Sequence, residues 1–134
     1  MIDAGPRDPR DDRRRNRTES ALEALTRLVE ASRRRAGLEA VTVSDQGGFL
    51  LAGAGAHRLC EELAAWAPVM AHGADNDTVP TSLDSFESRT RLRRLAVDGI
   101  EIVVTLCGPG AAESPELEAV SAGCERILGQ RSAS

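Results

Sequence analysis

Residues 90–107 read TRLRRLAVDGIEIVVTLC, and this stretch decides the fold class of the chain. Two strand-like runs flank Asp98-Gly99, a dipeptide that favours the type I′ turn because both central residues of that turn adopt positive φ. The second run is rich in β-branched and large apolar residues, which is typical of a strand covered on both faces. Arg93 and Arg94 interrupt the alternation of the first run, so we expect a bulge or a frayed edge there.

A second hairpin is predicted upstream of this one. Residues 38–43 alternate, and residues 49–52 form an apolar strand without a polar position. The segment between them, residues 44–48, consists of turn-forming residues and ends in two glycines that tolerate positive φ. Because the second strand is apolar throughout, we expect it to be covered on both faces.

Three amphipathic helices are predicted around the two hairpins. Apolar residues recur at three- and four-residue intervals within residues 18–37, 57–72 and 114–129. Pro68 lies inside the second segment and is expected to kink that helix. Ser114 followed by proline is a typical opening for the third. The order helix, hairpin, helix, hairpin, helix predicts an α+β domain.

Length and charge indicate one domain with short tails. The chain has 134 residues, 41% of them hydrophobic, and a formal net charge of −4. Residues 1–17 are rich in Arg and Asp and nearly devoid of apolar side chains, so we expect a disordered tail. We assign residues 18–130 to the folded domain and residues 131–134 to a disordered end. The acidic body argues against nucleic-acid binding through the tail arginines.

The residue inventory argues against an enzyme. All 17 basic residues are Arg, which excludes a phosphate-binding loop lysine and a pyridoxal phosphate Schiff base. Gly53-x-Gly55 lacks the third glycine of a dinucleotide-binding loop, and His57-x-x-Cys60 lacks the further ligands of a zinc site. We therefore expect no catalytic residue, no cofactor and no metal.

Cellular location is predicted from two further features. The three cysteines, Cys60, Cys107 and Cys124, lie in apolar stretches, so we expect buried, reduced thiols. No apolar run approaches the roughly 20 residues that span a bilayer. The sequence thus predicts a cytoplasmic protein that does not bind membranes.

Residues 41–53, VTVSDQGGFLLAG, and residues 63–70, LAAWAPVM, resemble the roadblock (dynein light chain) domain family. Within that family the chain is most similar to stand-alone bacterial members that partner small Ras-like GTPases. The resemblance covers residues 18–130 and implies an α-β-β-α-β-β-β-α sandwich, with a central antiparallel sheet and helices on both faces. The additional strand of that order would lie at residues 83–86.

The resemblance also implies a function. Family members form homodimers with their middle helices side by side, and they bind small GTPases or motor and signalling components. For this chain we therefore expect a homodimer whose partner is a small Ras-like GTPase or a response-regulator-type protein. The second predicted helix has apolar residues beyond a single stripe, which indicates burial against a second copy or a partner. Candidate residues of this dimer or partner surface are Leu59, Leu63, Trp66, Val69, Met70 and Phe86. Alternatively, Trp66 packs within its own chain under residues 73–82.

A small-ligand sensor of similar architecture is the alternative function. Such a site needs convergent polar groups inside an apolar pocket. Thr105, Ser121 and His57 are the polar residues that the sequence offers for it. The sequence alone leaves this alternative open.

Overall fold

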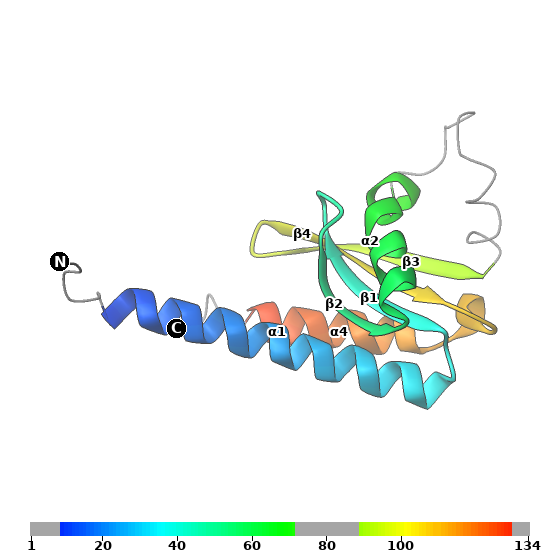
Figure 1. The fold of residues 1–134 in the computed structure, drawn as a ribbon, viewed down its shortest axis with the longest axis horizontal. Coiled ribbons are helices and arrows are strands. Elements are labelled where there is room, and N and C mark those ends of the chain that lie inside the picture. Colours follow the sequence, from blue (N-terminus) through cyan, green and yellow to red (C-terminus); the bar gives the residue numbers. More distant parts are fainter. Residues whose placement is uncertain (1–8, 72–88, 130–134) are drawn as a thin grey trace.

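The computed structural model describes residues 9–71 and 89–129, with side chains from residue 19 onward (Figure 1). The chain forms two hairpins and the helices that flank them. In order, the elements are α1 (Pro9–Ala36), β1 (Ala40–Asp45), β2 (Leu50–Gly55), α2 (His57–Ala71), β3 (Thr90–Val97), β4 (Ile100–Cys107), the short 3₁₀ helix η1 (Ala111–Glu113) and α4 (Glu116–Gly129).

The strands form one antiparallel sheet in the order β2-β1-β4-β3. This arrangement confirms the predicted α+β fold class, while the strand expected at residues 83–86 lies outside the described residues. The turn between β3 and β4 also follows the sequence prediction, because Asp98 and Gly99 have φ values of 52° and 81°. The two predicted hairpins are therefore neighbours in a single sheet.

The predicted bulge at Arg93 and Arg94 is not present in the structure, so this prediction is wrong. Pairing between β3 and β4 is regular from Thr90↔Cys107 to Val97↔Ile100. The Arg93 guanidinium donates to both carboxylate oxygens of Glu118 at 2.7 Å, and Arg94 pairs with Glu101 at 3.2 Å. Because each arginine has a carboxylate near it, both fit into a regular strand. The register shift occurs instead between Val43 and Ser44 on β1.

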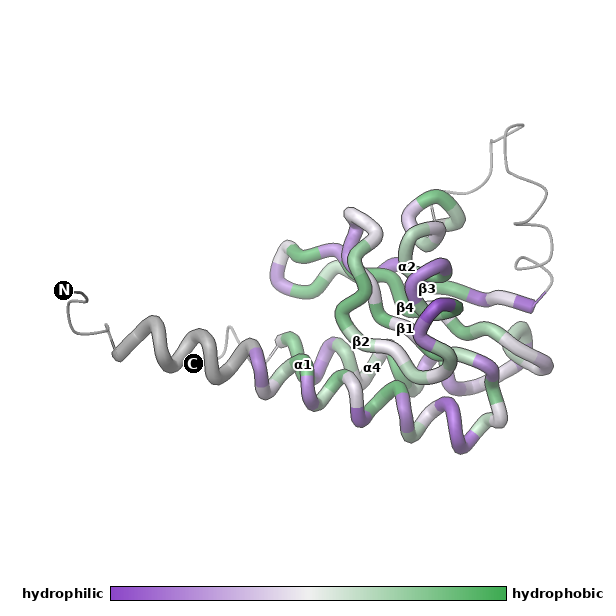
Figure 2. Tube along the Cα trace, viewed as in Figure 1, coloured by the Kyte–Doolittle hydropathy of each residue, from purple (hydrophilic) through white to green (hydrophobic). Residues whose placement is uncertain are grey.

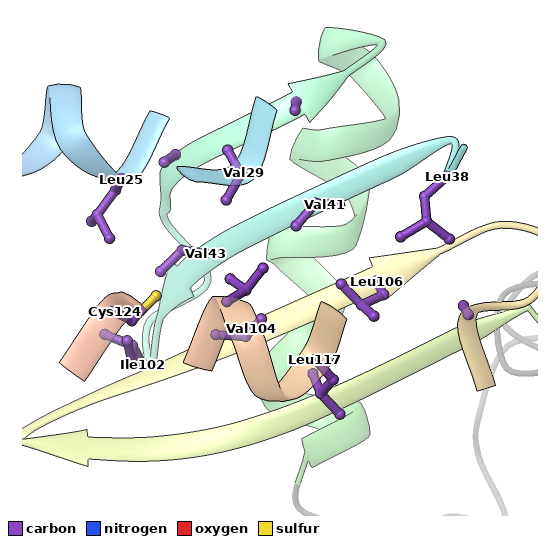
Figure 3. Packing of buried hydrophobic residues seen from close by; sticks show 14 residues of the cluster. Leu25, Val29, Leu38, Val41, Val43, Ile102, Val104, Leu106, Leu117 and Cys124 are labelled. Atoms are coloured by element: carbon purple, nitrogen blue, oxygen red, sulfur yellow. The ribbon is translucent and has the colours of Figure 1, made fainter. Parts of the chain in front are cut away.

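Helices α1 and α4 cover one face of the sheet, and α2 covers the other (Figure 1). Hydrophobic positions concentrate along β1 and β4, the two central strands (Figure 2). Beneath α1 and α4 lies the main core, a cluster of 14 buried residues (Figure 3). Its largest fully buried members are Leu25, Val29, Val41, Val43, Ile102, Val104, Leu106, Leu117 and Val120.

Helix α1 begins at Pro9, earlier than the expected start near residue 18. Proline is favoured in the first turn of a helix. Asp11 precedes Arg15 by four residues, a spacing at which opposite charges stabilise a helix. Residues 9–17, which we expected to be disordered, therefore continue the helix beyond the end of the sheet (Figure 1).

A buried carboxylate joins α1 to α4. Glu116 accepts a hydrogen bond from the Ser32 hydroxyl at 2.8 Å and two from the Arg35 guanidinium at 2.6 and 3.0 Å. These bonds, with Arg35 as the largest cause, hold the pKa of Glu116 below its usual value. The Glu116 amide donates to the Ser114 hydroxyl at 3.1 Å, which confirms the predicted cap of this helix.

Strand β2 lies between two helices at the edge of the described sheet. It pairs only with β1 in the described sheet, and Leu50, Leu51 and Gly53 are half-buried. Helix α1 contacts β2 on one face and α2 contacts it on the other, so the predicted cover on both faces is confirmed, and the partial exposure comes from the position of β2 at the edge of the described sheet. The strand also begins at Leu50, which leaves Phe49 in the preceding turn.

Candidate interaction surface on helix α2

Helix α2 contacts the sheet through a narrow stripe of mostly small residues, Cys60, Leu63, Ala64 and Ala67. The stripe allows close approach: a Cβ added at Gly53 of β2 would lie 3.1 Å from the Cys60 sulfur. The core on this side has four buried members, Ala40, Cys60, Leu63 and Cys107. It is therefore much smaller than the core beneath α1 and α4.

The sheet face beneath α2 is also unusually polar. Ala40 and Cys107 pair across β1 and β4, and the next pair on the same face is Thr42↔Thr105. Both threonines are buried, and neither hydroxyl has a hydrogen-bond partner among the described residues. Buried hydroxyls without partners oppose burial rather than favour it. Helix α2 is consequently attached by few apolar contacts.

The larger apolar residues of α2 lie beside the buried stripe. Leu59, Trp66 and Met70 are half-buried and follow one another at spacings of seven and four residues, so they share one flank of the helix. Val69 is 36% exposed on a different side. The prediction that Leu63 lies on the surface is wrong, because this residue is fully buried and belongs to the core. Phe86 lies outside the described residues.

The turn between β1 and β2 adds an exposed aromatic ring that the sequence reasoning missed. The Asp45 carboxylate accepts hydrogen bonds from the amides of Gly47 and Phe49, each at 2.9 Å, and so fixes the turn. Phe49 is 72% exposed. The turn borders α2, since a Cβ at Gly48 would lie 3.5 Å from the Ala65 Cα. The double glycine before Phe49 was the available signal that this residue ends a turn.

Polar residues lie on the solvent side of α2. His57 and Glu61 are both exposed and form a pair one turn apart at 3.4 Å, and Arg58 and Glu62 are exposed as well. Cys60, in contrast, is buried, so His57 and Cys60 do not converge on a metal site. Within residues 9–71 and 89–129, no group of three or more His, Cys, Asp or Glu side chains is arranged to hold a metal ion.

The cysteines do not suit nucleophilic chemistry. All three are free and buried, as the sequence predicted. Burial raises the pKa of Cys124 to about 12. Burial likewise raises the pKa of Cys60, against the smaller opposing effect of the Arg33 charge. Thiols in this state are poor nucleophiles because the reactive thiolate is scarce.

The polar residues considered for a small ligand are not brought together. Thr105 lies beneath α2, whereas Ser121 belongs to α4 on the opposite face of the sheet. His57 is exposed at the start of α2 and pairs with Glu61.

None of the described helices is long and apolar enough to cross a membrane.

Comparison with known proteins finds similarity in structure only. No family model matches the sequence, and no curated protein sequence matches it. The gliding protein MglB from Thermus thermophilus aligns with a TM-score of 0.54 and 16% identity, covering 82% of this chain and 92% of that one. Myxococcus xanthus MglB aligns with a TM-score of 0.50 and 13% identity, covering 84% and 90%.

A further MglB structure, described as having a tetrameric arrangement, aligns with a TM-score of 0.52 and 15% identity, covering 82% and 91% of the two chains. The alignments span nearly the whole of these proteins, so the likeness concerns the complete domain. The chain therefore has the roadblock-like α+β fold of the MglB structures, as the resemblance in its sequence predicted.

Proposed function

We propose that this chain is a non-enzymatic homodimeric module whose dimer binds a small Ras-like GTPase or an associated signalling protein. The single observation that carries the proposal is the flank of α2 formed by Leu59, Trp66 and Met70. These are the large apolar side chains of the helix that its own sheet does not fully bury. Apolar surface of this kind on a soluble domain is typical of an interaction site.

The spacing of the flank favours a second helix as its partner. Residues at intervals of seven and four form the narrow seam along which two helices pack side by side. Trp66 and Met70 offer large contact areas, and tryptophan is enriched among residues that dominate binding energy. A second copy of the same helix presents the same seam, so a two-fold arrangement buries both flanks together.

The proposed GTPase partner rests on the likeness to MglB and on the family resemblance of the sequence. The described part of the chain offers exposed arginines, including Arg58, but no geometry that marks one of them as acting on a bound nucleotide. Any effect on GTP hydrolysis would come either from ordering the partner's own residues or from an arginine supplied in trans. The exposed side chains of Phe49 and Val69, which lie outside the proposed dimer flank, would suit such a partner.

Light scattering tests the dimer. The wild-type protein should show twice the chain mass of 14.3 kDa, and Trp66→Arg should show the single mass with an unchanged circular dichroism spectrum. Ile100→Arg is the matched control, since Ile100 is a 47% exposed apolar residue at the start of β4. That variant should remain dimeric. A wild-type protein that is monomeric at all concentrations would refute the proposal.

Binding to a GTPase is tested separately. The dimer should bind a Ras-like GTPase encoded near its own gene and change the rate at which that GTPase hydrolyses GTP. The protein alone should hydrolyse no GTP. A stable dimer that binds no such GTPase would be consistent with the proposed dimer and would refute the proposed GTPase partner.

A further inference from the structure

A polar groove lies between the C-terminal half of α1 and β2, an edge strand of the described sheet. The two elements contact each other along this border. The groove has a volume of about 280 Å³. Its lining residues are Glu30, Arg33, Arg34, Gly53, Ala54 and Gly55.

The two arginines retain unused hydrogen-bond donors. Arg33 donates from Nε to the Glu39 carbonyl oxygen at 3.1 Å, which fixes the side chain but leaves its terminal nitrogens available. Arg34 is exposed and has no ion-pair partner among the described residues. Their neighbour Arg35 is committed to Glu116. The groove thus has two available guanidinium groups and one carboxylate, that of Glu30.

The wall opposite the arginines consists of backbone. Gly53 and Gly55 have no side chains, and the Ala54 methyl is buried in the core. Packing requires this glycine wall: Gly55 has φ 119°, and a Cβ there would collide with the Glu39 carbonyl. Because β2 pairs only with β1 in the described sheet, the backbone N–H and C=O groups on its outer side have no strand partner. The backbone of residues 53–55 and the two guanidinium groups therefore line the same small space.

We propose that this groove binds a phosphoryl group carried by a small molecule. Guanidinium groups match phosphate oxygens in geometry and form paired, charge-assisted hydrogen bonds with them. The space is large enough to admit a phosphoryl group and lies just below the usual size of a site for a drug-sized ligand. Its local positive charge stands out on a chain whose net charge is −4. The proposal does not depend on the dimer or on the GTPase partner.

Titration with inorganic phosphate at constant ionic strength tests the site, with amide shifts of Gly53, Ala54 and Gly55 as the readout. These shifts should saturate together. Arg34→Gln should weaken binding about tenfold, which is the loss expected for one charge-assisted contact. Glu30→Gln should strengthen it about twofold by removing a like charge. Neither variant changes a residue of the buried core.

The control variant is Arg126→Gln, which removes an equal charge from an exposed position in the last turn of α4. It should bind phosphate like the wild type. Equal losses in Arg34→Gln and Arg126→Gln would mean that general electrostatics explains the binding, and would overturn the site. Unsaturable shifts would overturn it as well. Acetate binding as tightly as phosphate would overturn the assignment to a phosphoryl group.

Discussion

Replacing Leu63 by alanine should release α2 from the sheet while leaving the rest of the domain folded. Leu63 is the largest residue of the four-member core beneath α2 and is fully buried. The main core, with its 14 members, lies on the opposite face and contains none of these four residues. The two cores are separated by the sheet, so loss of the small one need not disrupt the large one.

The expected magnitude follows from the burial of Leu63. A fully buried Leu→Ala substitution costs about 3 kcal/mol. If α2 opens independently, this free energy lowers the protection of its amides about 150-fold. If the domain instead unfolds as one unit, the unfolding entropy of about 2.1 cal/mol/K per residue converts 3 kcal/mol into a Tm loss of about 11 °C.

Native-state hydrogen exchange separates these outcomes. In Leu63→Ala the amides of α2 should lose protection while those of β1 and β4 keep it, and Tm should fall by much less than the value for the whole domain. Leu25→Ala is the control, because Leu25 is equally buried in the main core. It should lower protection throughout. Equal losses in α2 and β4 of Leu63→Ala would refute the independent attachment of α2.

Two further predictions concern stability. Arg35 lowers the pKa of Glu116 below its usual 4.5, so the ionised carboxylate stabilises the fold at pH values above 4.5. This stabilisation is lost as the pH falls through the lower pKa of the folded protein. Glu116→Gln should therefore make Tm depend less on pH in the acid range. Gly55→Ala should destabilise the fold by about 2 kcal/mol or more because of its positive φ and the collision with Glu39, measured as a lower urea midpoint. Gly47→Ala, where a Cβ would make only ordinary contacts, should change the midpoint little.

Local sequence signals predicted turns and helix caps correctly, because a dipeptide such as Asp-Gly or a serine before proline favours one local conformation. Asp98-Gly99 formed the expected turn, and Ser114 capped its helix. The bulge at Arg93 was predicted wrongly because its partner Glu118 lies 25 positions away, on a helix whose placement over the strand cannot be read from local pattern. Long-range pairing of charges is decided by tertiary packing, which alternation does not encode.

The interaction surface could be predicted only in outline. Leu63 and Trp66 are both large and apolar, and periodicity alone does not say which side of the helix faces the sheet. That choice depends on the sheet face beneath α2, where Thr42 and Thr105 form a polar surface that suits small residues. The threonines were visible in the sequence, but their position beneath α2 follows only from the register between β1 and β4.

The polar sheet surface beneath α2 also explains why this helix is suited to binding a second chain. A helix that served only to cover its sheet would place its largest side chains over the core, because burial stabilises the fold in proportion to apolar area. In α2 the buried stripe is mostly small, and Trp66 and Met70 lie on the flank. Cover for that flank adds apolar contacts to a weakly attached helix. Attachment of α2 and pairing of two chains would then stabilise each other, since whatever binds the docked helix shifts its equilibrium toward the docked state.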